Sequence, residues 1–303
     1  MNSQPFGRYE LLKKLAVGGT TTVWLARLPG SGGESARDLV LKLLLPHLAD
    51  EPQVVEAFKR EALLAGHLTH PNIARIYEFG QVNDSHYIAR EFVPGGTAGE
   101  VLRKGRPSLS PALALRLMCA ACEGLHYVHT RTDHLGRPLK VLHLDAHLDT
   151  LLIGLDGAVK WIGFGRNLSA GAAALPPAFL MSGVIRMAPE QLKDKPLDHR
   201  TDIFALGRML YELLTGARPF KRDSQLETLR AILDLELEPP SVVANTPPGL
   251  DPIVMKAMAR EPDGRYSSAR ELQQELERFM AEQRWEATAE QLGQLMAAAR
   301  QRR

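Results

Sequence analysis

The chain has 303 residues, of which 45% are hydrophobic and 24% are charged. This mixture is typical of an ordinary globular protein, and it excludes a disordered chain, a collagen-like repeat and a low-complexity linker. Lysine and arginine total 37 against 35 aspartates and glutamates, which leaves a formal net charge of +2. So small an excess gives no reason to expect a nucleic-acid partner, since such partners usually need a clearly basic surface.

Cysteine usage and hydropathy bear on the compartment. The two cysteines, Cys119 and Cys122, are too few for a disulfide framework. The first nine residues are polar and lack the apolar core of a signal peptide. No stretch approaches the roughly eighteen uninterrupted apolar residues of a membrane span. We therefore expect a protein of the reducing cytoplasm without a membrane span.

The first part of the chain, to about residue 92, predicts a strand-rich unit. Turn signals such as Gly18-Gly19 and Asn83-Asp84 separate short apolar runs. One helix is expected among them, from about Pro52 to His67, because its apolar residues recur at helical spacing. The expected strands are Tyr9–Leu15, Val23–Leu28, Asp38–Leu45, Ile73–Phe79 and His86–Phe92.

After Gly95-Gly96 the pattern becomes mostly helical. Ser110-Pro111 predicts the start of a helix that runs to His129. The segment Thr201–Leu214 is apolar on nearly all sides, as in a helix buried inside a domain. We therefore predict an α+β fold with a strand-rich lobe over about residues 9–92, a larger helical lobe over about 95–280 and a cleft between them. Residues 281–303 are expected to form a helical tail, packed back on the large lobe or offered to a partner helix.

Several signals that carry chemistry follow one another in a particular order. A glycine-bearing turn at Gly18 precedes Lys42, an isolated lysine in an apolar strand, and Glu61 follows on the predicted helix. His143-Leu144-Asp145 comes after the long helix, and Gly163-Phe164-Gly165 and Met187-Ala188-Pro189-Glu190 come later. This order resembles the protein-kinase signature set over about residues 9–280, and most closely the bacterial Ser/Thr protein kinases.

The resemblance implies a bilobal kinase fold, with an antiparallel β-sheet and one main helix in the small lobe. It also implies roles for individual residues. Asp145 takes the position of the catalytic base. The positions that would bind ATP are Gly18, Val23, Val40, Lys42, Glu61, Glu91, Val93 and Leu152. The positions that would have structural roles are His143, Phe164, Glu190, Asp202 and Arg265.

Both metal-binding positions of the family pattern are altered. The motif's asparagine lies five residues after the catalytic aspartate, where this chain has Thr150. The resemblance places the second ligand, an aspartate, at Gly163. Glycine offers no ligand for magnesium and a threonine hydroxyl offers a weak one. Losing one preorganised electrostatic contact can cost on the order of 10²–10³ in rate.

Other departures surround the same pocket. The catalytic-loop arginine is replaced by Leu144, the residue two after Asp145 is His147, and the tyrosine expected before Met187 is Arg186. Arg90 stands at the back of the adenine pocket, where an apolar side chain is usual, and is expected to occlude the pocket or to compete with Lys42 for Glu61.

These departures predict a pseudokinase, a catalytically inactive or strongly impaired scaffold. Its expected partner is a protein (an active kinase, a signalling protein or a second copy), and its ATP binding would be weak, metal-independent or absent. The alternative is an active Ser/Thr kinase, or another phosphoryl or nucleotidyl transferase, that uses Asp145 and Lys42 in an atypical way. Cys119 with Cys122, and the histidines near His143, could instead suggest a metal site, although packed core residues are the simpler interpretation.

Overall fold

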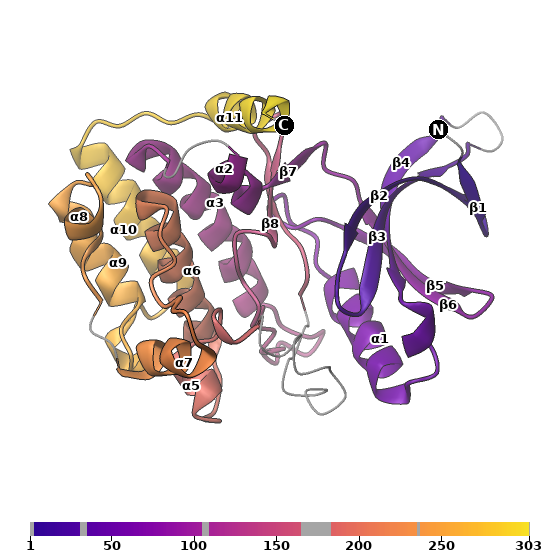
Figure 1. Ribbon diagram of the computed structural model, residues 1–303, viewed down its shortest axis with the longest axis horizontal. Coiled ribbons are helices and arrows are strands. Elements are labelled where there is room, and N and C mark those ends of the chain that lie inside the picture. The colour runs from indigo at the N-terminus through magenta and orange to yellow at the C-terminus, as the bar shows by residue number, and fades with distance from the viewer. Residues whose placement is uncertain (1–2, 31–34, 105–108, 165–182, 235–236, 303) are drawn as a thin grey trace.

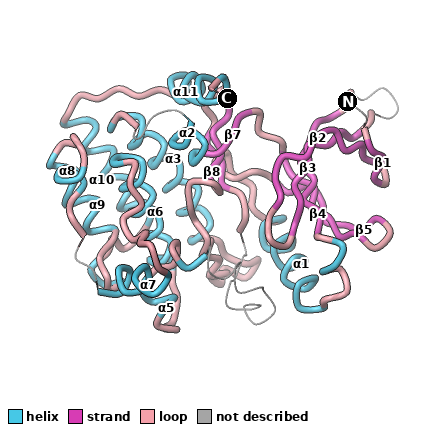
Figure 2. The backbone as a smooth tube through the Cα atoms, viewed as in Figure 1, coloured by secondary structure: helices cyan, strands magenta, loops and turns pink. Residues whose placement is uncertain are grey.

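The computed structural model describes residues 3–30, 35–104, 109–164, 183–234 and 237–302. Two lobes lie side by side, with the strand-rich N-terminal lobe at the right of Figure 1 and the helical lobe at the left. Figure 2 shows the same division, with strands dominating one lobe and helices the other. The predicted α+β, kinase-like fold is therefore confirmed.

The small lobe is built on an antiparallel six-stranded sheet in the order β1-β2-β3-β4-β6-β5. Its core forms on both faces of the sheet because side chains alternate along a strand. Leu39 and Leu41 pack with Tyr9 and Tyr87 on one face, whereas Ile88 packs under helix α1 on the other. The elements are β1 (Gln4–Phe6), β2 (Tyr9–Val17), β3 (Thr21–Leu28), β4 (Arg37–Leu44), α1 (Pro52–Gly66), β5 (Ile76–Val82) and β6 (Ser85–Glu91).

One expected strand is displaced along the chain. Ile73–Phe79 was expected to be a strand, but β5 begins only at Ile76. Ile73 is buried and forms an isolated bridge with Trp161, so it packs in the core of the large lobe. The apolar run that begins at Ile73 therefore crosses the boundary between the lobes. Hydropathy alone does not show where that boundary lies.

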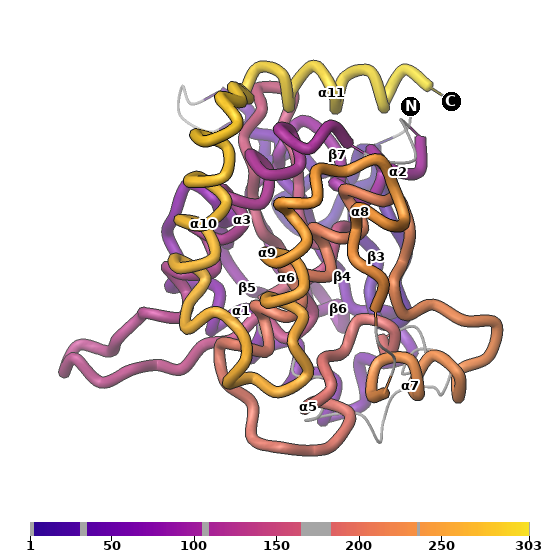
Figure 3. The backbone as a smooth tube through the Cα atoms, turned by 90° about the vertical axis from the view of Figure 1, so that its left-hand side faces the viewer, coloured from indigo at the N-terminus to yellow at the C-terminus, as the bar shows by residue number. Residues whose placement is uncertain are grey.

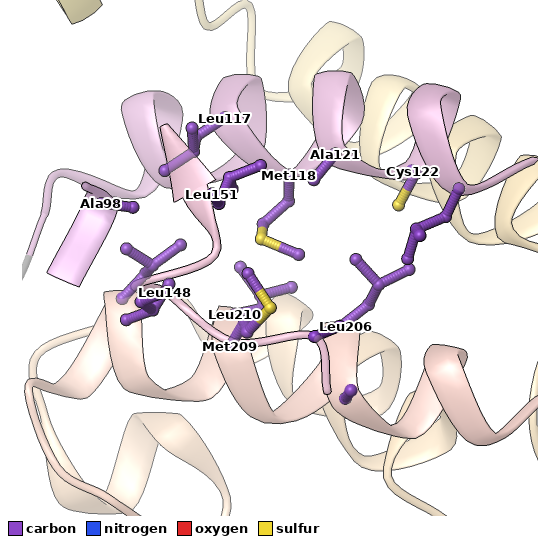
Figure 4. Close-up of a cluster of buried hydrophobic side chains, with 14 of the residues drawn as sticks. Ala98, Leu117, Met118, Ala121, Cys122, Leu148, Leu151, Leu206, Met209 and Leu210 are labelled. Atoms are coloured by element: carbon purple, nitrogen blue, oxygen red, sulfur yellow. The ribbon is translucent and has the colours of Figure 1, made fainter. Parts of the chain in front are cut away.

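The large lobe surrounds two long helices, α3 (Pro111–His129) and α6 (His199–Thr215). Figure 4 shows Met118 and Cys122 of α3 facing Leu206 and Met209 of α6. α6 is buried on nearly all sides, as its composition predicted. The other helices are α2 (Ala98–Lys104), α5 (Pro189–Leu192), α7 (Gln225–Asp234), α8 (Pro240–Val243), α9 (Asp251–Ala257), α10 (Ala269–Glu282) and α11 (Ala289–Gln301).

A small sheet of β7 (Gly95–Thr97), β8 (Leu151–Gly154) and β9 (Val159–Trp161) lies where the chain passes between the lobes. Helix α11 crosses over α2 and β7, as Figure 3 shows from the side. Leu292 and Met296 of α11 are fully buried, so the tail helix packs on its own domain. Within the described ranges, no helix is long and apolar enough to span a bilayer.

Candidate active site

A buried ion pair joins the central strand of the small lobe to its helix. The Nζ atom of Lys42, on β4, lies 2.6 Å from each carboxylate oxygen of Glu61, on α1. Each residue is 8% exposed, so both charges are largely withdrawn from water. A charged group buried to this degree needs an opposite charge, and the two-oxygen geometry supplies it. The ammonium is thereby held at a fixed point between β4 and α1.

The predicted adenine-pocket residues share the face of the sheet that carries Lys42. Val23 is the partner of Lys42 on β3, and Val40 lies two residues away on β4, so these side chains project from the same face. At the glycine turn, Gly18 N donates to the carbonyl of Thr21 at 2.7 Å. A Cβ at Gly18 would make only ordinary contact with its neighbours, so packing in this conformation does not require glycine there.

The segment between the lobes is fixed by Glu91. Its backbone N–H donates to Arg75 O at 2.8 Å, and its carboxylate lies 3.0 Å from Lys160 Nζ on β9. Val93 follows as a partly buried residue, and Leu152 of β8 pairs with Thr97 of β7. These contacts hold the segment between the lobes against the large lobe. Binding of an adenine ring at the backbone around Glu91 and Val93 stays a prediction.

Arg90 lies on the same sheet face as Lys42, because its register partner on β4 is Val40. The residue is partly exposed, and its Nε atom is shielded from solvent. Glu61 already holds Lys42 with both oxygens. Occlusion of the adenine pocket by Arg90 remains a prediction.

The catalytic loop is held from below by Asp202, at the start of α6. Its carboxylate accepts hydrogen bonds of 2.8 Å from the backbone N–H groups of His143 and Leu144 and contacts His129 Nε2 at 2.8 Å. Leu144 adopts a positive φ of 62°. A left-handed conformation is costly for a residue with a branched side chain, so it persists only where surrounding contacts impose it. Asp202 supplies such contacts.

The carboxylate of Asp145 is enclosed. Its Oδ1 atom lies 2.9 Å from Arg186 Nε and 3.8 Å from His147 Nε2, and the side chain is 1% exposed. Arg186 stands 41 positions away in sequence, just before α5. It therefore covers the residue at the catalytic-base position with a positive charge.

His147 beside this carboxylate is a neutral imidazole. Burial lowers its pKa to about 3, and this effect outweighs the opposing influence of Asp145. Its Nδ1 accepts a hydrogen bond from Asp149 N at 3.1 Å, which leaves the proton on Nε2, toward Asp145. The position two after the aspartate thus holds a neutral imidazole, whose Nε2 atom lies beyond hydrogen-bond distance of Asp145.

The two predicted metal positions do not fit a magnesium ion. The Thr150 hydroxyl donates to the carbonyl of His147 at 2.8 Å and accepts from His147 N at 3.0 Å, so it is engaged with the loop backbone. Gly163 has a φ of 86° and no side chain. In the described part of the chain, no group of three or more His, Cys, Asp or Glu residues could hold a metal ion. The fixed ammonium of Lys42, in contrast, does fit a nucleotide phosphate.

The residues expected to have structural roles are all buried. His143 packs with Phe164 at a ring-centroid distance of 4.7 Å, and its Nε2 lies 3.1 Å from Ile162 O. Glu190 and Arg265 form a buried pair with N–O distances of 2.6 and 2.8 Å. Together these contacts tie the loop and the end of the following segment to the large lobe.

Cys119 and Cys122 are free thiols inside α3. Burial raises the pKa of Cys119 to about 12 and that of Cys122 well above its usual value, so both are inert packing residues. Ser169 and Ser182, the hydroxyl residues of the segment after Gly163, lie outside the described residues.

The contact between Arg186 and Asp145 is the part of the site that sequence reasoning missed. The signal was present, because Arg186 replaces the tyrosine expected before Met187. Nothing in the sequence identifies the partner of Arg186, because 41 positions separate it from Asp145.

Comparisons with known proteins agree with this geometry. A family model described as "Protein kinase domain" matches residues 9–289. The chain is 39% identical over 284 residues to "Tyrosine-protein kinase MasK" of Myxococcus xanthus, covering 92% of this chain and 44% of that protein. It is 32% identical over 277 residues to "Serine/threonine-protein kinase PknB" of Mycolicibacterium smegmatis, covering 89% and 42%. The chain therefore spans less than half the length of these curated relatives.

Among solved structures, the kinase domain of Mycobacterium tuberculosis PknI superposes with a TM-score of 0.67 at 23% identity, covering 91% of this chain and 97% of that one. This likeness concerns the fold. Together with the sheet order and the helical lobe, it confirms the predicted bilobal architecture.

The prediction of a pseudokinase scaffold is wrong. The relatives described above are named as kinases, and similarity to them extends along about nine-tenths of the chain. That prediction gave two altered metal positions more weight than the rest of the site, in which Lys42, Glu61 and Asp145 are retained and held in place. From the match over residues 9–289, the chain belongs to the protein kinase domain family.

Proposed function

We propose that this domain is an active protein kinase that transfers the terminal phosphoryl group of ATP to serine or threonine hydroxyls of a protein substrate. The observation that carries this proposal is the buried Lys42–Glu61 pair, with both carboxylate oxygens 2.6 Å from Nζ. Holding such a pair out of water is costly unless the geometry is good, and in kinases this pair positions the nucleotide phosphates.

Each position that matches the kinase pattern then has a role in binding. Lys42 neutralises phosphate charge, and the turn at Gly18 covers the phosphates from above. Val23, Val40 and Leu152 pack against the adenine ring, while the backbone at Glu91 and Val93 is the edge that its polar atoms meet. ATP supplies the phosphoryl group when bound, and neither Thr150 nor Gly163 contributes a metal ligand.

Asp145 is the proposed acceptor of the substrate hydroxyl proton, and Arg186 makes its use atypical. The guanidinium stabilises the carboxylate as an anion and orients Oδ1. Because Asp145 is 1% exposed, the substrate hydroxyl reaches it only after Arg186 moves aside. Arg186 is thus a positioning residue that also brings positive charge beside the reacting centre.

Tyrosine is the second candidate acceptor, because the relative at 39% identity is named a tyrosine kinase. The proposed partner and compartment are those expected from the sequence. The partner is a protein substrate, and the compartment is the cytoplasm, where ATP is available and the thiols Cys119 and Cys122 stay reduced.

The Lys42→Met variant tests the proposal. We expect a fall in phosphoryl transfer of at least about 10²-fold, because one preorganised charge contact at the phosphates is lost. The assay follows label from γ-labelled ATP into a mixed protein substrate, and phosphoamino-acid analysis identifies the acceptor. Lys42→Arg keeps a cation beside Glu61 and controls for folding, while Lys13→Met on exposed β2 is the matched surface control. Equal transfer by wild type and Lys42→Met would contradict the proposal.

A further inference from the structure

A cavity of about 470 Å³ opens beside the catalytic loop. Its walls come from α2, the catalytic loop, the segment before α5 and the end of α6. His147 and Arg186 line it, and both also face Asp145 Oδ1, at 3.8 and 2.9 Å. Whatever binds in this cavity therefore lies next to the proposed proton acceptor. The volume is in the range of ordinary ligand sites.

The cavity wall carries more positive than negative side chains. Four arginines line it against two carboxylates, Asp149 and Glu212. His147 adds no charge, because its imidazole is neutral at physiological pH. The whole chain has a formal net charge of only +2, so a positive surplus is not a general property of the chain.

Both carboxylates already have cationic partners within the wall. Arg103 forms two hydrogen bonds with Asp149, at 2.8 and 3.1 Å. Arg208 binds Glu212 at 2.6 Å and is almost fully buried, with its second nitrogen on Ala146 O at 2.8 Å. A basic peptide side chain would have to displace one of these arginines to find an anion.

Arg218 is different from the other three arginines. It follows the end of α6, where Gly216 turns the chain at a φ of 72°. It is exposed, and within the described residues its side chain has no hydrogen-bond or ion-pair partner. An anionic group entering the cavity would meet this charge directly.

We propose that the cavity binds an acidic segment of the protein substrate, with Arg218 as the residue that determines this preference. The anionic group is a carboxylate or a phosphorylated side chain, because both pair with guanidinium groups. The inference rests on the proposed kinase function, since it places the acidic segment close to the acceptor hydroxyl.

The test compares peptides that share one acceptor and differ in the flanking residues. Glutamate, phosphoserine, alanine and lysine versions are phosphorylated by wild type, Arg218→Glu and Arg230→Glu. Arg230 is an exposed arginine on α7 that does not line the cavity, so its reversal is the matched control. We expect wild type to prefer glutamate over alanine by about fivefold at low salt, as partly exposed ion pairs provide, and to prefer it less at high salt. Arg218→Glu should reverse the preference toward lysine, and Arg230→Glu should leave it unchanged.

A second readout separates this inference from the proposed function. The same peptides are given a fluorescent label, and their binding is measured by fluorescence anisotropy without ATP. This measurement requires no phosphoryl transfer. If no peptide is phosphorylated but the acidic ones bind more tightly through Arg218, the kinase proposal fails and the cavity assignment stands. Equal binding and equal rates for glutamate and lysine peptides, or an effect of Arg230→Glu as large as that of Arg218→Glu, would overturn the assignment. A gain for phosphoserine over glutamate identifies a phosphorylated segment as the preferred ligand.

Discussion

Asp145 Oδ1 faces two nitrogen atoms of different character, the guanidinium Nε of Arg186 at 2.9 Å and the neutral imidazole Nε2 of His147 at 3.8 Å. The first stabilises the carboxylate as an anion, whereas the second lies beyond hydrogen-bond distance and adds no charge. An acid–base residue is useful only when it is in the right protonation state. At the scale of single residues, the contact with Arg186 therefore favours the anionic carboxylate that the proposed proton acceptor requires.

The buried imidazole of His147 predicts a pH dependence of folding stability. Its pKa is about 3 in the folded protein, from a usual value of 6.5. Between these values the unfolded chain binds a proton that the folded chain refuses, so stability falls as the pH falls through this window. We expect wild type to lose up to about 1.4 kcal/mol per pH unit more than His147→Asn between about pH 6 and 4.

Urea unfolding of both proteins at a series of pH values measures this difference. His134→Asn, at an exposed loop histidine, is the control and should run parallel to wild type. A wild-type profile parallel to that of His147→Asn would show that His147 titrates normally in the folded protein.

Among the elements, α11 ties the tail to the hinge region. Its Met296 is 0% exposed and lies close to Gly96 of β7, where an added Cβ would stand 3.0 Å from the sulfur. Gly157 has a φ of 80° and approaches Ala289 so closely that any side chain there would collide with its carbonyl. The start and the middle of the helix are thus both fitted to the small sheet between the lobes.

Met296→Ala tests how much this docking contributes. Removing a fully buried methionine should cost about 2–4 kcal/mol of unfolding free energy, with faster hydrogen exchange over residues 289–301. Leu226→Ala, at an exposed position of α7, is the control and should change stability little. Unchanged stability and exchange in Met296→Ala would mean that the helix is only loosely held.

Periodicity predicted α1 well, because one face of that helix is buried, and the apolar composition predicted α6, which is buried on nearly all sides. It failed at Ile73, because the apolar run there serves the cores of both lobes in turn. The ion pair of Lys42 and Glu61 could be expected from the order of the motifs. The contacts of Asp145 with Arg186 and of Asp149 with Arg103 could not, because only the folded backbone brings those positions together.

For the whole molecule, the two altered metal-ligand positions say less about activity than the contacts that hold the catalytic loop in place. Thr150 and Gly163 remove two metal ligands, but Asp202 still braces the loop and Arg265 still holds Glu190. Phosphoryl transfer depends on positioning and on charge neutralisation. Lys42 and Arg186 each place a positive charge in the proposed site, beside Glu61 and Asp145 respectively.

Transfer of label from γ-labelled ATP to protein, by wild type and by Asp145→Asn, tests the central claim most directly. The Asp145→Asn substitution keeps the size of the side chain and removes its basicity. Asp84→Asn, in an exposed turn, is the control. Assays with Mg²⁺, with Mn²⁺ and with a chelator cover the possible nucleotide forms. We predict incorporation by wild type and Asp84→Asn and a loss on the order of 10²–10⁴ in Asp145→Asn. No incorporation by wild type under any of these conditions, or equal incorporation by wild type and Asp145→Asn, would contradict the account.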